Sequence, residues 1–301
     1  MATSLIFYPT PLFLILLGFS LSLSLANVPQ SSKLIEPESV CSSTPHPTFC
    51  KSLFPPNKPC NILDYFHSSA HMSLSTTRKF LYLLNRYRKR SSLWETAIRA
   101  LDDCRLLSEL NIDFLLSSMK VVNSTNTLSI FRAHDVQSLL SAILTNQITC
   151  FDSLNSTALM PWSVKNGLHV PLSTGTKMYS VSLSLFTHGW VKNQNKAIPE
   201  GNLVKTTTGS VTVREKVVVR QDGKGDFTTI NDAVAAAPNG TSMSGGYFVI
   251  YVVAGIYPEY VTIDKNKTYI MMIGDGINQT VITGNRSVND GWTTFNSATL
   301  G

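Results

Sequence analysis

The sequence contains little charge and lacks the local motifs of several enzyme classes. Only 15% of its 301 residues are charged, whereas 43% are hydrophobic, a balance that excludes disorder throughout the chain. No C-x-x-C pair or nearby histidine cluster supports a metal site. No G-x-S-x-G motif is present, and the six histidines form no recognisable pair with a serine nucleophile. The Gly-x-Gly at 223–225 is not followed by Gly-Lys-Ser/Thr, so we reject a nucleotide site.

The excess of positive charge points to an acidic partner. The formal net charge is +6 at pH 7, and the isoelectric point is near 9.0. On charge alone, nucleic acid, anionic lipid and an acidic polysaccharide are all candidates. The choice between these three partners depends on the cellular compartment of the protein.

An apolar run at the amino terminus predicts secretion. Residues 12–25 read LFLILLGFSLSLSL, and the small residues Ser24 and Ala26 fit a signal-peptidase site, so we predict a signal peptide at 1–26. The positively charged segment that usually precedes such a run is missing, and a membrane anchor is the competing interpretation. Because the run is shorter than the roughly 20 residues of a spanning helix, we favour cleavage and expect no membrane contact afterwards.

Glycosylation acceptors agree with export. The sequon N-x-S/T occurs six times after the predicted signal, all on the segment that would be lumenal. We expect glycans on some of these asparagines: Asn123, Asn155, Asn239, Asn266, Asn278 and Asn285.

The first half of the chain has the periodicity of amphipathic helices. In the second of four segments, apolar residues fall on one face: Trp94, Ala97, Ile98, Leu101 and Cys104. Pro161, Gly167 and Pro171 are breakers that we expect between the third and fourth helices. The predicted helices are 62–90, 92–122, 134–154 and 177–190. Four helices of this length predict an antiparallel four-helix bundle.

The pattern changes after residue 190. The stretch 191–215 is rich in Lys, Asn, Thr and Gly and is predicted to be a linker. Beyond it lie short β-rich runs and one helix at 229–237; the runs are 217–220, 247–253, 260–263, 269–274 and 280–284. Several are apolar throughout, as expected of strands covered on both faces. Their spacing suits a sandwich, a barrel or a solenoid, and the spacing alone does not distinguish between these three folds.

Five cysteines precede the linker: Cys41, Cys50, Cys60, Cys104 and Cys150. An odd number in a secreted chain leaves at least one unpaired or paired between molecules. Cys41 and Cys50 are close enough in sequence for a local staple. Cys104 and Cys150 lie on the apolar faces of the second and third predicted helices, so a bridge between them would tie those helices together.

This pattern resembles the plant invertase and pectin-methylesterase inhibitor family over residues 36–190. The matching residues are Cys41-SSTPHPTF-Cys50, Ala100-Leu-Asp-Asp-Cys104 and Leu140-SAILTNQIT-Cys150. The resemblance implies that Cys41 pairs with Cys50 across a short helical hairpin. It also implies that Cys104 pairs with Cys150 between helices of a four-helix bundle. Cys60 falls outside the pattern and is assigned as a free thiol.

The second half resembles the beginning of the plant pectinesterase catalytic domain. The ordered motifs are DGKGDFTTI at 222–230, AGIYPE at 254–259, IGDG at 273–276, TVITG at 280–284 and DGWTTFNSAT at 290–299. The family signature G-x-Y-x-E falls on Gly255, Tyr257 and Glu259. The resemblance implies a right-handed parallel β-helix that hydrolyses methyl esters of cell-wall homogalacturonan to pectate and methanol, without metal or organic cofactor. We therefore predict two domains, an inhibitor-like four-helix bundle at 36–190 and a truncated β-helix at 216–301.

The groups that carry the chemistry in that family are absent from this sequence. The family uses one Asp as nucleophile, another as general acid/base, Gln side chains for the oxyanion and an Arg that orients the nucleophile. Its motifs Q-A-V-A-L, Q-D-T-L, D-F-I-F-G and L-G-R-P-W do not occur here. We assign no catalytic residue, predict that the chain as given is inactive, and keep a truncated gene product as an alternative. Family position suggests only Thr294 as a pectin contact; otherwise it is a strand threonine.

The other charged groups are interpreted as structural. Asp102 and Asp103 are expected on a solvated helix face, and Asp275, between two glycines, in a turn. The basic cluster at 86–90 could attract a polyanion or an acidic partner, but we favour a solvated helix end that complements the helix dipole. The expected partners are pectin and, through the helical domain, a pectinesterase or an invertase; nucleic acid is not expected. A binding protein is thus the competing function.

Overall fold

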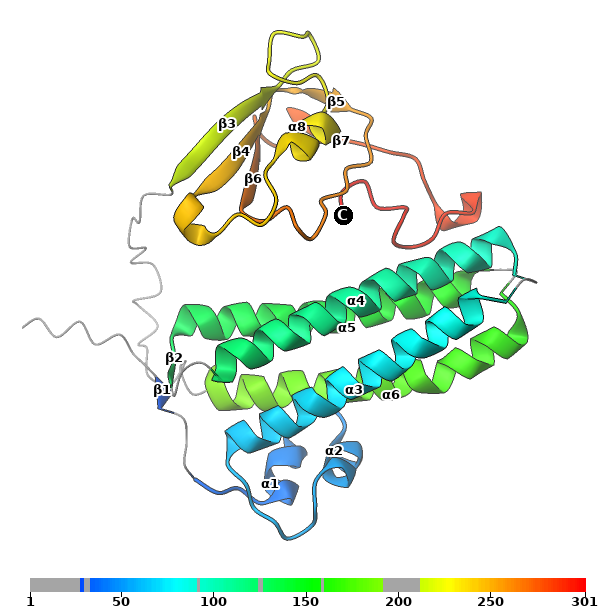
Figure 1. Cartoon of the computed structure of the whole chain (residues 1–301), viewed down its shortest axis with the longest axis vertical. Coiled ribbons are helices and arrows are strands. Elements are labelled where there is room, and N and C mark those ends of the chain that lie inside the picture. Colours follow the sequence, from blue (N-terminus) through cyan, green and yellow to red (C-terminus); the bar gives the residue numbers. More distant parts are fainter. Residues whose placement is uncertain (1–27, 30–32, 91–92, 124–126, 158–159, 192–211) are drawn as a thin grey trace, which may run out of the picture.

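The structure is a computed structural model that describes residues 28–29, 33–90, 93–123, 127–157, 160–191 and 212–301. Within these ranges a helical region is followed by a smaller region of parallel strands (Figure 1). The predicted signal peptide at 1–26 and most of the predicted linker lie outside the described residues.

Four long helices form the helical region. They are α3 (Ile62–Arg88), α4 (Glu95–Asn123), α5 (Ile130–Ser156) and α6 (Trp162–Phe186). Helix α3 packs against α4 and α6, and α5 packs against the same two helices, so the four enclose a common core. Two short helices, α1 (Pro37–Ser42) and α2 (Pro47–Leu53), lie beside α3 (Figure 1). Strand β1 (Val28–Pro29) pairs antiparallel with β2 (Thr127–Leu128).

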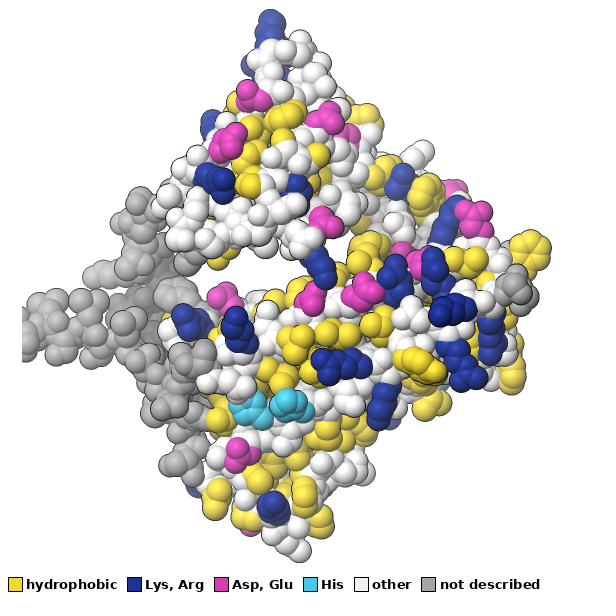
Figure 2. All heavy atoms as spheres, viewed as in Figure 1, with side chains coloured by type: hydrophobic (Ala, Val, Ile, Leu, Met, Phe, Trp, Pro, Cys, Tyr) yellow, Lys and Arg dark blue, Asp and Glu magenta, His cyan; other side chains and the backbone are white. Residues whose placement is uncertain are grey.

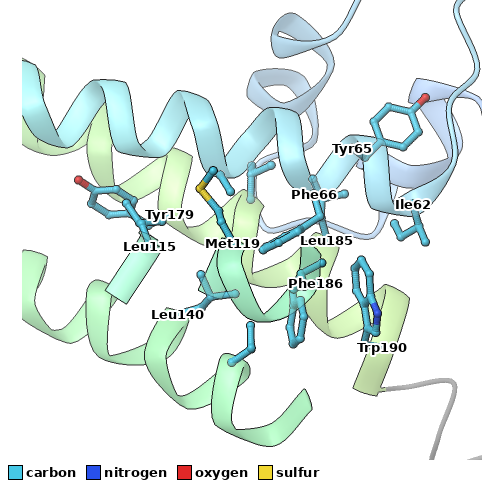
Figure 3. Packing of buried hydrophobic residues seen from close by; sticks show 14 of the residues in the cluster. Ile62, Tyr65, Phe66, Leu115, Met119, Leu140, Tyr179, Leu185, Phe186 and Trp190 are labelled. Atoms are coloured by element: carbon cyan, nitrogen blue, oxygen red, sulfur yellow. The ribbon is translucent and has the colours of Figure 1, made fainter. Parts of the chain in front are cut away.

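Helix caps and apolar faces explain why these helices form. The side chain of Asn61 accepts a hydrogen bond from the Asp64 N–H at the start of α3, and Ser129 caps α5 in the same way. At one end of the core, Phe186 stacks on Trp190 with ring centroids 5.0 Å apart, and Phe66 packs against both (Figure 3). A second cluster, here called the distal cluster, is built from α3, α4, α5 and α6 and has Leu101 at its core.

The first three predicted helices are confirmed, but the fourth was predicted to begin too late. Helix α6 begins at Trp162, not at 177, and contains two of the three expected breakers, Gly167 and Pro171, while Pro161 is its N-cap. Pro171 lies inside α6 and has no N–H to donate to the Gly167 carbonyl four residues earlier. A Cβ on Gly167 would lie 1.9 Å from the Tyr87 hydroxyl oxygen of α3, so this glycine permits close packing of the two helices.

One residue of the predicted apolar face of α4 does not point inward. Trp94 is 64% exposed, because it precedes the first residue of the helix, Glu95. Ala97, Leu101 and Cys104 are fully buried, in agreement with the predicted face.

The strand-rich region contains two parallel sheets. Strands β3 (Val213–Val219), β4 (Tyr247–Val252) and β6 (Ile270–Gly274) form one sheet in the order β3-β4-β6. Strands β5 (Gly255–Tyr257) and β7 (Thr280–Ile282) form the second. Helix α8 (Ile230–Ala236) connects β3 to β4, and 3-10 turns cover Met243–Gly245 and Val288–Asp290. Long crossovers of this kind are required between parallel neighbours.

A separate apolar core lies under α8. Ile230 and Ala233 of the helix pack with Val219, Phe248 and Ile250 from β3 and β4, and all five are almost fully buried. The burial of successive strand residues accounts for the continuous apolar runs in the sequence.

The predicted strand at 260–263 is wrong. Only Val261 forms a bridge, with Leu300, while the regular strand of this stretch is the preceding β5. Pro258 has no N–H to donate, and it ends β5 directly after Tyr257.

Replacing Gly167 by alanine tests the close approach of α6 to Tyr87. We expect Gly167→Ala to lower the free energy of unfolding by about 1–3 kcal/mol, because the new methyl group overlaps the phenol. In a Tyr87→Ala background the overlap is gone, and the same substitution should be neutral or stabilising by up to about 1 kcal/mol, since alanine is the better helix former. Urea unfolding followed by circular dichroism measures both. An equal loss in the two backgrounds would contradict the contact.

Candidate functional site

Thr294, the residue that we expect to contact pectin, lies in a turn. The turn covers 294–297, and the Ser297 hydroxyl donates to the Thr294 carbonyl oxygen at 2.9 Å. The alternative of a strand threonine is therefore wrong. The side chain is half-buried, and contact with pectin stays a prediction.

The same turn packs against the helical region. Asn296 Nδ2 donates to Asp103 Oδ1 of α4 at 2.8 Å and to Thr293 Oγ1 at 3.0 Å. Phe295 is partly buried against the distal cluster. Thr293 is itself only 6% exposed. The turn thus joins two regions that are far apart in sequence.

The two neighbouring aspartates of α4 have different surroundings. Asp102 pairs with Arg88 of α3, whose Nη2 lies 3.2 Å from Asp102 Oδ2. Asp103 is only 6% exposed, so our expectation that it lies on a solvated face was wrong. Successive helix residues point about 100° apart, which turns the Asp102 carboxylate toward α3 and the Asp103 carboxylate under the turn that contains Asn296. No local signal could reveal this, because Asn296 is 193 positions away.

Burial changes the acidity of Asp103. Loss of water raises its pKa above the ordinary value, and the negative charge of Asp102 raises it further. The Thr293 hydroxyl and the Asn296 amide favour the ionised form, but they do not cancel the effect of burial. Asp103 Oδ2 is buried and has no hydrogen-bond partner among the described residues.

A second polar contact links the two regions further along α4. Lys265 Nζ lies 2.7 Å from Asp113 Oδ2, and about half of each side chain is exposed. The hydrogen bond and the charge of Asp113 raise the pKa of Lys265. A cleft of about 190 Å³ lies toward the beginning of α4. Thr96 and Thr157 line it from the helical region, and Trp292 lines it from the strand-rich region.

The signature Gly255, Tyr257 and Glu259 has structural contacts. Tyr257 is buried and its hydroxyl donates to the Val253 carbonyl oxygen at 2.8 Å. The Glu259 carboxylate accepts from the Ile230 N–H at 2.9 Å and from the Asn231 N–H at 3.0 Å, at the start of α8. A carboxylate at this position satisfies unpaired amides and complements the helix dipole.

The other aspartates of the strand-rich region are also engaged locally. Asp275 accepts from the Tyr251 hydroxyl and the Ala254 N–H, and chiefly the first of these lowers its pKa. Asp226 accepts from the Val218 N–H at 2.7 Å, and Asp290 from the Ser287 hydroxyl at 2.6 Å. These contacts fit turn and cap positions. Within the described ranges no group of three or more His, Cys, Asp or Glu is arranged to hold a metal ion.

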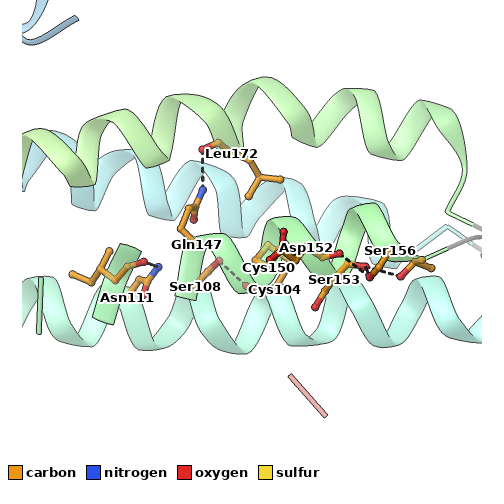
Figure 4. Close-up of a disulfide and its surroundings, with 11 residues drawn as sticks. Cys104, Ser108, Asn111, Gln147, Cys150, Asp152, Ser153, Ser156 and Leu172 are labelled. Carbon is orange, nitrogen blue, oxygen red and sulfur yellow. Dashed lines mark hydrogen bonds between the residues drawn. A yellow bond between two sulfur atoms is a disulfide. The ribbon is translucent and has the colours of Figure 1, made fainter. Parts of the chain in front are cut away.

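Two disulfides hold the helical region. Cys41 and Cys50 join α1 to α2, and Cys104 and Cys150 join α4 to α5 (Figure 4). Both are the pairs that the family resemblance implies. Cys60 is a free, half-buried thiol. Beside the second disulfide, buried Gln147 donates to the Leu172 carbonyl oxygen at 3.0 Å and links α5 to α6 (Figure 4).

The surface carries basic side chains and open sequons. Lys and Arg side chains gather on the helical region near the end of α3 (Figure 2), where Arg86 and Arg88 occupy the last turn. All six sequon asparagines are exposed. Of the helices in the described part, none combines the length and the apolarity needed to cross a bilayer.

Comparison with protein families divides the chain at the same place as the fold. Residues 36–185 match the model of the plant invertase/pectin methylesterase inhibitor family. Residues 216–301 match the pectinesterase model.

Curated relatives contain both regions in this order. Probable pectinesterase/pectinesterase inhibitor 41 of Arabidopsis thaliana is 43% identical over 309 residues, which cover 87% of this chain and 54% of that protein. Probable pectinesterase/pectinesterase inhibitor 7 of the same plant is 43% identical over 97% of this chain and 60% of its own. The chain therefore spans about half the length of the curated relatives it matches.

Two solved structures are similar to parts of the chain. Pectin methylesterase from carrot is 49% identical over 28% of this chain and 25% of its own, with a TM-score of 0.27. A pectin methylesterase inhibitor from Arabidopsis thaliana is 17% identical over 51% of this chain and 95% of its own, with a TM-score of 0.37.

Glu259 offers a test of whether the signature is structural. We expect Glu259→Ala to destabilise the strand-rich region by about 1–3 kcal/mol, because it leaves amides of α8 without their charged acceptor. Glu259→Gln keeps one acceptor oxygen and should cost less. Hydrogen exchange of the α8 amides in the whole chain measures the effect. Exposed Glu215 of β3 provides the control, since Glu215→Ala should leave the exchange unchanged.

Proposed function

Because the chain belongs to the plant pectinesterase/pectinesterase inhibitor family, we propose that it forms the inhibitor-like domain and the first coils of an enzyme that demethylates cell-wall homogalacturonan. The observation that carries this proposal is the presence of both family regions, in the family's order, in one chain. The four long helices would then be the four-helix bundle of the inhibitor family. The stacked parallel strands would begin a right-handed parallel β-helix.

The parallel pairing is the feature of the fold that supports a β-helix. Ile250 of β4 lies opposite Val217 of β3 on one side and Met272 of β6 on the other. Strands that stack in register in this way bury each other's apolar side chains, as the coils of a solenoid do. The pair β5 and β7 repeats the arrangement in a second sheet.

We also propose that these 301 residues do not themselves hydrolyse pectin. Esterase chemistry of the family needs an aspartate free to attack the ester and a second group to transfer the proton. Asp226, Asp275 and Asp290 are instead bound to neighbouring backbone or hydroxyl groups. Asp103, the one aspartate among the described residues whose pKa is raised, is buried beneath the turn that contains Asn296.

Binding of an esterase is the second candidate function, and the inhibitor-family match over 36–185 favours it. In this case the helical region would act on a separate pectinesterase or invertase. The surface of α3, with its exposed basic side chains, is available for such contacts (Figure 2).

One assay with two arms tests both functions. The purified chain is first incubated with methylated pectin, and we expect no methanol above the blank, whereas an active pectinesterase in the same buffer releases it. In the second arm the chain is titrated into that pectinesterase and, separately, into an invertase. Methanol release proportional to the chain's own concentration would overturn the proposed inactivity. No effect on either enzyme would exclude the inhibitor function.

The proposed site of action is the extracellular cell wall. The apolar amino-terminal run supports secretion, the six exposed sequons support glycosylation, and the net charge of +6 supports attraction to an acidic polysaccharide. Plant-cell expression with mass spectrometry tests this. We expect a mature amino terminus at Asn27 and a mass that falls on treatment with an N-glycosidase. A retained Met1 and an unglycosylated chain would contradict it.

A further inference from the structure

An open groove runs along the outward face of α3, near the middle of the helix. Its volume is about 520 Å³, which lies within the range of sites that hold small molecules. We propose that this groove binds a short stretch of an acidic polysaccharide, with Arg78 and Lys79 opposite its carboxylates and Tyr82 against a sugar ring. The negative charge of the ligand follows from the groove itself, whereas the choice of a polysaccharide rests in part on the proposed cell-wall location.

The exposed side chains that line the groove form one stripe along α3. They are His71, Ser75, Arg78, Lys79 and Tyr82. Spacings of three and four residues place side chains on the same face of a helix, so these groups point in one direction. At a rise of about 1.5 Å per residue, the stripe from His71 to Tyr82 is about 16 Å long. It can therefore contact several sugar rings of one chain at once.

The two cations in the groove have no acidic partner among the described residues. Neither Arg78 nor Lys79 forms an ion pair there, and α3 contains no Asp or Glu after Asp64. Helix α6, which packs on α3, contains no acidic residue. On α4, by contrast, every carboxylate except that of Asp103 has a basic partner. The positive charge of the groove is thus left for an anion from outside.

The helix dipole does not account for these two cations. Basic side chains are favoured in the last turn of a helix, and this effect explains Arg86 and Arg88. The effect is confined to that turn, whereas Arg78 and Lys79 stand roughly two and a half turns before the end of α3. Lys and Arg side chains continue from the middle of α3 to its end, so the positive surface extends beyond the groove (Figure 2).

Tyr82 supplies a surface for the uncharged face of a sugar. It is 68% exposed, and it is the one large hydrophobic side chain that α3 leaves exposed. Its ring has no aromatic or cationic neighbour among the described residues. The C–H groups of a sugar ring pack on such an aromatic face. Cations on the same stripe can then pair with the carboxylates that the sugars carry.

A protein or a membrane matches the same features less well. Charged residues, and lysine in particular, are depleted at the centre of protein interfaces, yet Arg78 and Lys79 stand in the middle of this groove. A bilayer presents its negative charges in a plane and does not enter a concave surface. A chain of acidic sugars provides both the negative charges for the cations and the apolar ring faces for Tyr82.

Titration calorimetry on the whole purified chain tests this proposal. The probe is a fully demethylated oligogalacturonate of defined length, and the buffer is kept near pH 7, where the uronic carboxylates are ionised. We expect binding at low ionic strength that weakens about tenfold or more in about 1 M salt, where the Debye length falls to about 3 Å. The methyl ester of the same oligomer offers no charge and should bind at least about tenfold more weakly.

Paired variants locate the binding site, and circular dichroism checks that each one is folded. Arg78→Gln with Lys79→Gln removes both charges and should weaken binding about tenfold. Tyr82→Ala should weaken it about fivefold, whereas Tyr82→Phe keeps the ring and should stay within about twofold of the parent chain. The matched control is Lys120→Gln with Arg132→Gln. It removes the same net charge from exposed positions on α4 and α5 and should also stay within about twofold.

Several results would overturn the proposal. Absence of oligogalacturonate binding by the parent chain would exclude the site. An equal loss in the control and in the groove variant would assign binding to net charge and not to the groove. Vesicles of phosphatidylserine and phosphatidylcholine are the further probe. If the groove variant loses the vesicles but keeps the oligomer, the groove binds a membrane. If it loses the pectinesterase of the methanol assay instead, the groove binds a protein.

The binding measurement is independent of the proposed esterase lineage. It needs neither methanol release nor secretion, so a chain that fails to bind the oligomer leaves the outcome of those assays unchanged.

Discussion

The disulfide between Cys104 and Cys150 fixes how α4 is turned, and the other contacts of α4 follow from that orientation. The disulfide directs the Cys104 side chain at α5. The Asp103 side chain then points about 100° away from Cys104 around the helix axis, and the Asp102 side chain points about another 100° away from Asp103. One aspartate therefore reaches Arg88 of α3, and the other faces the strand-rich region. A single covalent link thus sets the surface on which the second half of the chain rests.

The helical half was largely predictable because its signals are local. Apolar spacing acts over a few turns and located three helices, and the family resemblance implied both disulfide pairs. The beginning of α6 was missed because Gly167 and Pro171 usually stop helices. Here the glycine makes room for Tyr87 of α3, and only the packed structure contains that information. Trp94 was misassigned for a simpler reason, because the helix begins at Glu95 and not at the predicted residue 92.

The strand-rich half was predictable in its elements and less so in its contacts. Apolar runs marked the strands, but the run at 260–263 follows Pro258 and forms the isolated bridge of Val261 with Leu300 in place of a regular strand. The signature glutamate, Glu259, reaches 29 positions back to the first amide of α8, so its contribution is to hold the helix on the sheet. Asp103 was the largest error in the candidate site. Its burial depends on a partner 193 residues away, and nothing near position 103 distinguishes it from its solvated neighbour.

The contact between Asn296 and Asp103 joins parts of one polypeptide, and this changes how strong it needs to be. Two segments tethered on one chain meet at a higher effective concentration than the same segments on separate molecules. A few polar bonds and one aromatic ring, too little to hold separate molecules together, can then keep the regions associated in most of the population. The association is also independent of how dilute the protein is. Cutting the backbone between the two regions would leave every contact atom unchanged and still remove that advantage.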